Sequence, residues 1–225
     1  MAINDEFFLP GPLSVLEEMI SRFGKADFWQ AVGTSMLRIT VGYLLGVCAG
    51  VLLSFLTSVS AVMKAIFSPL ISVIRATPVV SFIILVFLFF DRSEVPVYIV
   101  MLTVAPMIWG SLTEGVGATD VTLKEMTGVY RFSFFSKMRH LYIPSLLPYF
   151  KAAAVTSFGF AWKSGVAAEV ICYPDRSIGK LIYKSRTALD SRSVFAITAV
   201  VIIISMLLEA IFKFILSRSK RGDKV

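Results

Sequence analysis

Five apolar runs constrain this sequence more than any other feature, because each is long enough to cross a lipid bilayer as a helix. The runs cover residues 36–57, 69–90, 95–113, 149–170 and 194–216. A membrane-spanning helix needs about 20 apolar residues to cross a hydrocarbon core of about 30 Å. Only 16% of the residues are charged, whereas soluble domains carry about 25%. The chain is therefore predicted to be an all-α integral membrane protein.

Two of the runs contain residues that restrict how their helices pack. Gly42, Gly46 and Gly50 recur every fourth residue in the first run, a spacing that lets another helix approach closely, although glycine is frequent in membrane helices generally. The second run is interrupted by the sequence RATP, where Pro78 removes a backbone donor and Arg75 needs a polar or aqueous neighbour. This helix is predicted to be kinked and to face a cavity or an interface over part of its surface.

The basic residues follow the pattern of membrane topology. The formal net charge is +7, and Lys and Arg fall mostly in short loops and at the ends of apolar runs, which argues against nucleic acid as a partner. By the positive-inside rule, residues 114–148 and the carboxyl tail are cytoplasmic, so five spans place the amino terminus outside. The loop 171–193 is then also outside, although its basic residues run against the rule, so either the span count is off by one or function shapes this loop. These residues are Arg176, Lys180, Lys184, Arg186 and Arg192.

An amphipathic segment precedes the first run. Ser14 and Glu17 have the spacing of a capping box. A helix lying on the extracytoplasmic surface of the membrane is predicted within residues 1–35. Its apolar face consists of Leu13, Leu16, Met19, Ile20 and Phe23. No basic region followed by a short apolar core begins the sequence, so no cleavable signal peptide is predicted. Residues 1–225 are interpreted as one domain, since no long linker divides them.

The segment TLKEMTGVYRFSFFSKMRHLYIPSLLP at residues 122–148 is too charged to span the membrane and too apolar to be a solvated linker. Thr122 and Glu125 have capping-box spacing, so a helix is predicted to begin there, and Pro144 and Pro148 are predicted to end it. Exposed aromatic residues between these points would suit a groove on a soluble partner. The alternative is an ordinary amphipathic helix lying on the membrane.

These residues carry a resemblance to a known family. Glu125, with Pro144 nineteen residues later and then Leu147-Pro148, resembles the cytoplasmic "EAA" loop of permease subunits in binding-protein-dependent ABC importers. The flanking sequences FWQAVGTSMLRITVGYLLGVCAGVLL, PLISVIRATPVVSFIILVFLF and FGFAWKSGVAAEVI are similar to the nitrate/sulfonate/taurine branch of that superfamily. The resemblance covers most of residues 28–216.

The resemblance implies a type I ABC importer permease fold with residues 114–148 as the coupling loop that docks into an ATPase subunit. The residues implied in this contact are Glu125, Tyr130, Arg131, Phe132, Phe134, Phe135 and Pro144. The sequence departs from the family pattern at three positions. Met126 and Thr127 replace the usual alanines, and Arg131 replaces the usual glycine, which puts the turn inside the loop in doubt.

The chain contains no GxxxxGK[ST] loop to cradle phosphates, so ATP hydrolysis is expected in a separate subunit and this chain is not expected to be an enzyme. The resemblance implies two partner ATPase subunits that bind ATP and magnesium, and a second copy of the permease. It also implies an extracytoplasmic solute-binding protein and a location in the bacterial inner membrane, in contact with lipid. Transport would proceed by rocking about a central site.

Ionisable residues inside the apolar runs indicate where a translocation pathway would lie. The candidates are Arg75, Pro78, Trp162, Lys163, Ser164 and Glu169. Their alternative interpretation is structural, with Lys163 and Glu169 paired with each other or with other polar groups. Arg75 and Lys163 favour a small anionic or strongly polar solute, and a pyrimidine-type vitamin precursor is the alternative within the resembled branch.

Other function classes fit the sequence less well. A secondary transporter or channel acting alone would be expected to show an inverted repeat, which is not detectable here. A membrane-embedded enzyme would need a recurring catalytic set within the spans, and none is visible. Cys48, Cys172 and His140 lack the spacing of metal ligands and are interpreted as structural.

Overall fold

The computed structural model describes residues 10–218, and within this range every regular element is helical. The first nine residues and the tail from residue 219, with the predicted cytoplasmic Lys220, Arg221 and Lys224, lie outside the described residues. The elements are α1 (Pro12–Phe23), α2 (Ala26–Val59), α3 (Ala61–Ala76), α4 (Val79–Phe87), α5 (Val95–Ala118), α6 (Val121–Val129), α7 (Phe134–Lys137), the π-helical turn η1 (Met138–Tyr142), α8 (Ile143–Cys172), α9 (Ile178–Thr187) and α10 (Ser191–Arg218).

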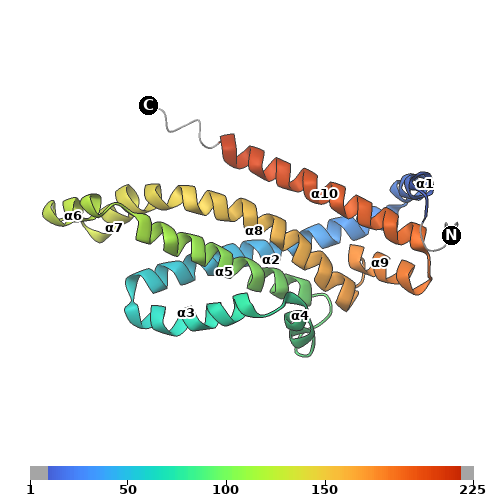
Figure 1. Cartoon of the computed structure of the whole chain (residues 1–225), viewed down its shortest axis with the longest axis horizontal. Helices are drawn as coiled ribbons and strands as arrows, with labels where there is room; N and C mark the ends of the chain where they lie inside the picture. The colour runs from blue at the N-terminus through green and yellow to red at the C-terminus, as the bar shows by residue number, and fades with distance from the viewer. Residues whose placement is uncertain (1–9, 219–225) are drawn as a thin grey trace, which may run out of the picture.

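Within residues 10–218, the helices are long and apolar enough for three of the five predicted spans, or for four if a bent pair is counted as one. By length and apolar composition α2, α5 and α10 are each able to cross a membrane, and α3 with α4 makes a fourth span if this bent pair is counted as one. The fifth predicted span lies in α8, which has 30 residues and runs beside α5 along the bundle (Figure 1). α8 itself is not apolar enough over any stretch to count as a span by the same measure, and it carries the charged residues Lys151, Lys163 and Glu169.

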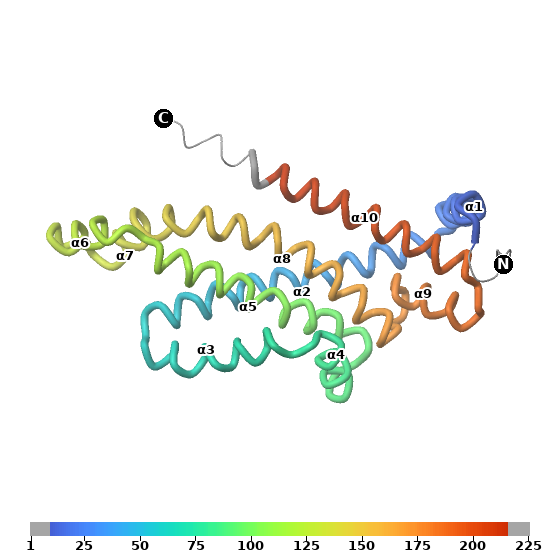
Figure 2. Tube along the Cα trace, in the orientation of Figure 1, coloured from blue at the N-terminus to red at the C-terminus, as the bar shows by residue number. Residues whose placement is uncertain are grey.

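The core forms where α5 packs against both α2 and α8, and Figure 2 traces these three helices along the bundle. Gly42, Gly46 and Gly50 lie on the face of α2 that meets α5. A Cβ atom at Gly46 would lie 2.7 Å from the Cβ atom of Val104, closer than two carbon atoms can pack. The predicted close approach of another helix to this glycine stripe is confirmed.

The second span is broken at the predicted place. α3 ends at Ala76, Thr77 is extended with ψ 131°, and Pro78 is the cap from which α4 begins. The two helices are bent by 103°. Pro78 lacks an N–H group, and its ring disfavours a helical conformation at the residue before it, so the helix stops instead of bending gently.

Neither capping-box pattern supplies the cap of its helix, and the helix predicted to begin at Thr122 begins at Val121 instead. α1 is capped by Gly11, and the Ser14 hydroxyl donates to the Gly11 carbonyl at 2.9 Å. Pro12 at the first helical position has its φ angle already set for a helix and starts it earlier. α6 is capped by Asp120, whose carboxylate accepts the Thr122 N–H at 2.7 Å, because α5 continues to Ala118 and leaves a short connection.

Pro144 and Pro148 do not end a helix, contrary to prediction. The chain is helical from Phe134 to Cys172 through α7, η1 and α8, with Pro148 inside α8. The π turn Met138–Tyr142 precedes Pro144. Its hydrogen bonds reach back five residues, so the N–H group that Pro144 lacks is not required there. The run therefore joins the segment 121–137 to α8 without a break.

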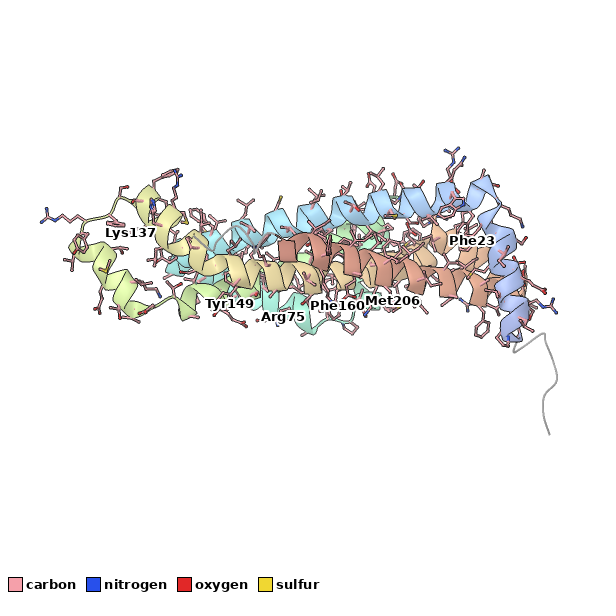
Figure 3. All side chains as sticks on the ribbon, turned by 90° about the horizontal axis from the view of Figure 1, so that it is seen from above. Phe23, Arg75, Lys137, Tyr149, Phe160 and Met206 are labelled. Atoms are coloured by element: carbon pink, nitrogen blue, oxygen red, sulfur yellow. The ribbon has the colours of Figure 1, made fainter. Side chains whose placement is uncertain are left out.

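The two ends of the bundle carry different elements. Figure 1 shows α1 and α9 at one end and α6 with α7 at the other, with α10 starting beside α1 and α9. α1 lies across the end of the bundle in Figure 3, the orientation expected of an interfacial helix. For residues 10–35 and the loop 171–193, this arrangement agrees with the predicted topology, in which both segments share one side of the membrane.

Candidate functional site

A groove of about 390 Å³ opens where the α3–α4 break faces α5 and α8. We call it the Arg75 groove. Its lining includes Arg75, Thr77, Phe82, Thr103, Met107 and Phe160. Pro78 lies between two of its lining residues, Thr77 and Val79. The break in the second span therefore shapes this groove.

Arg75 is exposed in the last turn of α3. A Cβ atom at Gly110 would lie 3.5 Å from its Nη1 atom, so the guanidinium group reaches across to α5. Within residues 10–218, Arg75 makes no ion pair. An unpaired cation in an apolar span has a high free-energy cost unless water or an anion reaches it. Figure 3 labels Arg75 and Phe160, which lie near each other on one side of the bundle.

Lys163 is on the exposed face of α8, one turn from Phe160. Its Nζ atom lies 5.8 Å from the Phe160 ring centroid, within the range of a cation–π contact. Lys163 does not pair with Glu169. Residues six apart in a helix with 3.6 residues per turn point in widely different directions, so Glu169 faces the core while Lys163 faces away.

Glu169 belongs instead to a buried polar cluster that joins three helices. Its side chain is 0% exposed, and its Oε2 atom accepts the Ser35 hydroxyl at 2.6 Å and the Gly179 N–H at 3.4 Å. Ser35 in turn accepts the Ile178 N–H at 3.0 Å. The cluster thereby fastens α2 and the end of α8 to the start of α9.

Arg38 completes this cluster. Its Nη1 atom lies 3.7 Å from Glu169 Oε1, and its Nη2 atom donates to the Asp175 carbonyl at 3.1 Å. Ser35 and Arg38 were not predicted as site residues. The available signal was an arginine inside the first long helix, since an ionisable residue in a span needs a partner. Trp162 and Ser164 are also buried, so with Glu169 they lie away from the Arg75 groove.

The segment from α6 to α7 projects from the end of the bundle opposite α1 and α9 (Figure 1). Every residue implied in ATPase contact is exposed: Glu125, Tyr130, Arg131, Phe132, Phe134, Phe135 and Pro144. Phe135 is 76% exposed. Val129, which was not singled out from the sequence, is 80% exposed. An apolar patch of this kind on a projecting segment marks an interaction surface.

The internal turn of this segment keeps a tight geometry in spite of the missing glycine. Arg131 has φ 47°, a left-handed conformation that glycine adopts more readily. The Phe132 N–H donates to the Thr127 carbonyl at 3.0 Å, and this bond closes the turn. The arginine therefore occupies the conformation expected of the glycine that it replaces, at a cost in strain.

The basic loop 171–193 folds into α9 at the end of the bundle opposite α6 and α7. Lys180 forms an ion pair with Asp175, and this contact is the main reason why the pKa of Asp175 is lowered. The Arg92 guanidinium lies 4.5 Å from the Tyr173 ring centroid, and Tyr173 stacks on Tyr183 at 4.6 Å. Together these contacts hold the loop between α4 and α5 against α9.

No group of three His, Cys, Asp or Glu side chains within residues 10–218 is placed to hold a metal ion. Cys48 is exposed and Cys172 is buried, and neither is in a disulfide. The Nδ1 atom of His140 lies 3.1 Å from the Ser136 carbonyl in the preceding turn.

Sequence comparison identifies the family. Residues 39–221 match the family described as "binding-protein-dependent transport system inner membrane component". The chain belongs to this family. It is a membrane-spanning permease component of an ABC importer, located in the inner membrane, and the predicted nitrate/sulfonate/taurine branch is confirmed by its relatives.

Two relatives illustrate the similarity of this permease to named importers. The nitrate import permease protein NrtB of Synechococcus elongatus is 26% identical over 198 residues, which are 83% of this chain and 71% of NrtB. The taurine transport system permease protein TauC of Escherichia coli is 26% identical over 211 residues, 90% of this chain and 75% of TauC.

Solved structures share the fold of this permease. A chain of the bacterial ABC transporter involved in import of the acidic polysaccharide alginate aligns with a TM-score of 0.68 at 13% identity, over 93% of this chain and 84% of that one. A chain of the MetNI methionine ABC transporter in an inward-facing conformation gives a TM-score of 0.63 at 14% identity, over 84% of this chain and 93% of that one. The predicted type I importer permease fold is confirmed.

Proposed function

We propose that this permease is driven by a separate ATPase subunit that docks on the α6–α7 segment. The observation that carries the proposal is the projecting position of this segment, with Val129, Tyr130 and Phe135 exposed at one end of the bundle. Apolar side chains at that position would be costly to leave in water and suit a groove on a soluble partner. ATP and magnesium are bound by that partner.

The translocation pathway runs along the Arg75 groove and is completed by a second copy of the chain. The groove is open along one side, and Arg75, Pro78 and Lys163 lie on or beside it. A second copy facing this side would enclose the groove between two broken spans. Closing of the ATPase subunits on ATP then rocks the two copies about this site.

The solute is a small anion. Arg75 and Lys163 place two cations near one face of the bundle, and neither has a carboxylate at ion-pair distance within residues 10–218. Two relatives are named for nitrate, which is an anion, and for taurine, which carries a sulfonate group. A bound anion would compensate the cost of the cations, which a neutral vitamin precursor would not.

The end that carries α1 and α9 faces outward and receives an extracytoplasmic binding protein. Basic residues on α9, including Lys184 and Arg186, are exposed there. Complementary charge on the binding protein would speed its docking and fix its orientation. This orientation places α6 and α7 on the cytoplasmic side, in agreement with the positive-inside rule. The basic residues of α9 lie on the opposite side and are an exception to the rule.

Copurification tests the ATPase contact. The tagged chain is expected to copurify with an ATP-binding-cassette ATPase subunit, and Phe135→Asp should weaken this assembly, because the substitution places an unpaired charge in an apolar contact. Leu13→Asp is the matched control, since Leu13 is an exposed apolar residue of α1 at the opposite end of the bundle. Normal copurification and coupled ATPase activity in Phe135→Asp would show that the contact lies elsewhere.

Uptake tests the pathway once assembly has been verified. Arg75→Met and Lys163→Met should each reduce transport of the native solute while leaving the amount of assembled complex unchanged. Lys64→Met is the matched control, since Lys64 is an exposed cation near the start of α3, outside the groove. Undiminished transport in both groove variants would remove these cations from the pathway.

A further inference from the structure

A second groove, of about 600 Å³, lies between α2, α5 and the continuous helical run from α7 to α8. We call it the coupling-end groove, because α7 forms part of its wall. The residues that matter for its chemistry are Phe55, Ser58, Val59, Phe134, Lys137 and Leu146. Figure 3 labels Lys137 at the same end of the molecule as α6 and α7. This groove shares no lining residue with the Arg75 groove, so it is not part of the proposed pathway.

The lining of the coupling-end groove is suited to a hydrocarbon chain. Most of it is apolar, and the Ser58 hydroxyl is already bonded to the Ser54 carbonyl at 2.7 Å. Lys137 is the charged residue in the lining, and it makes no ion pair within residues 10–218. A polar solute would find few partners here. An apolar chain with one negative group would match both features.

The groove continues a lipid-facing surface of α2. Among the exposed apolar residues of this helix, one set recurs mostly at intervals of three or four, which places its members on one face. They are Leu37, Val41, Leu44, Val51, Phe55 and Val59. In a membrane protein this face meets acyl chains, and its last three members line the groove. An acyl chain that follows α2 therefore reaches the groove along an apolar surface.

The α6–α7 segment touches α2 only loosely at this point. The Phe134 and Phe55 rings meet edge to face with centroids 6.5 Å apart, at the outer limit of such contacts. Phe134 is 62% exposed and Phe55 is 43% exposed, so the contact leaves both rings largely uncovered. Whatever fills the groove lies between the α6–α7 segment and α2 and supports both.

We propose that one anionic phospholipid occupies the coupling-end groove. Its acyl chain lies against Phe55, Val59 and Phe134, and its phosphate group lies beside Lys137. Binding of this lipid goes beyond the proposed function and does not require an ATPase partner. Its assignment to the cytoplasmic leaflet rests on the proposed orientation, and anionic lipids of that leaflet attract basic residues near the membrane surface.

Native mass spectrometry of the full chain tests the proposal. The delipidated protein in neutral detergent is titrated with phosphatidylglycerol and with phosphatidylcholine of the same acyl chains. One phosphatidylglycerol molecule is expected to bind about fivefold more tightly than phosphatidylcholine, the effect of one basic residue near an anionic lipid. Lys137→Gln should abolish this preference without weakening phosphatidylcholine binding.

Two further variants separate the headgroup from the chain. Lys64→Gln removes an exposed cation near the start of α3, outside the groove, and should keep the preference for phosphatidylglycerol. Ser58→Trp fills the groove with a ring and should weaken the binding of both lipids. An unchanged preference in Lys137→Gln would overturn the proposal. So would disulfide cross-linking between copies through Ser58→Cys, since a second copy would then occupy the groove.

Discussion

The Ser35 hydroxyl donates a 2.6 Å hydrogen bond to the buried carboxylate of Glu169, across 134 residues of sequence. This contact joins α2 to the end of α8, and the Ile178 N–H donates to the same hydroxyl. The cluster therefore holds α9 in place through one side chain. Its members are polar groups in an apolar protein, where the loss of one leaves the others without a partner.

Substitution in this cluster should destabilise the protein strongly. Glu169→Ala leaves the largely buried Arg38 guanidinium with no opposite charge, which costs about 3–5 kcal/mol. Ser35→Ala removes a partner from Glu169 and Ile178 and should cost about 1–3 kcal/mol. Unfolding of the purified chain in detergent, followed by circular dichroism, measures both. The partly exposed Glu209, which pairs with Lys213 near the surface, provides the control, since Glu209→Ala should change little. Equal effects at 169 and 209 would contradict a stabilising cluster.

Arg131→Gly should stabilise the α6–α7 segment. Arg131 has φ 47°, which is strained for a residue with a side chain and free of strain for glycine. We expect a gain of about 1 kcal/mol, seen as slower hydrogen exchange of the amide of Phe132 that closes the turn. Arg131→Ala is the control, because it removes the charge and keeps the strain. If alanine protects the turn as well as glycine does, the charge of Arg131 and not its conformation was responsible.

Gly46→Ala should destabilise the α2–α5 interface, whereas Gly117→Ala should not. The added methyl group at Gly46 would lie 2.7 Å from the Val104 Cβ atom, and overpacking of this kind costs about 1–3 kcal/mol. A Cβ atom at Gly117 in α5 meets nothing within 4 Å. Alanine there should be neutral or stabilising by up to about 1 kcal/mol. Thermal unfolding of the two variants gives the comparison, and similar midpoints would mean that the helices separate at little cost.

Acidification should loosen the junction between α1 and α10. Hydrogen bonds from the side chain and N–H of Ser193 lower the pKa of Asp190, which lies just before α10. A depressed pKa means that this contribution to stability is fully present above the unfolded-state pKa of about 4 and is lost as the pH falls through the lower folded-state pKa. The Ser193 hydroxyl also lies 3.0 Å from Glu18 Oε1 and accepts from Arg22 at 2.6 Å, so α1 is tied to the same point.

Limited proteolysis between pH 6 and pH 3, with a protease active over this range, measures the junction. Cleavage near α1 should rise at the acidic end in the natural protein. Asp190→Asn should be cleaved equally at both pH values, because its amide does not titrate. A pH dependence that survives in Asp190→Asn would assign the effect to another group, such as Glu18.

The sequence predicted those parts of the fold that depend on local chemistry. The long apolar runs located up to four spans, Pro78 located the break, and Gly42, Gly46 and Gly50 located a close helix contact. The helix ends were harder to predict from the sequence. Gly11 and Asp120 are the caps in the structure, but Ser14 and Thr122 have equally suitable spacing for that role.

The candidate site was predictable only in part. Arg75 and Lys163 were recognised as cations in apolar surroundings, and the structure places both near Phe160. The partners of Glu169 were not recognised from the sequence. Ser35 and Arg38 are far from Glu169 along the chain, and no local pattern pairs them with it. The coupling-end groove could not be predicted from the sequence either, because it forms only where α2, α5 and α8 come together in the folded chain.

The unbroken helical run from Phe134 to Cys172 makes the two ends of the bundle mechanically continuous. A displacement of α7 acts on one end of a stiff rod whose other end is clamped by Glu169 to α2 and α9. The π turn Met138–Tyr142 is the place where such a rod yields first, because its hydrogen bonds are the least regular. Force applied at α7 would reach α9 along one helical path, of which this turn is the most pliable point.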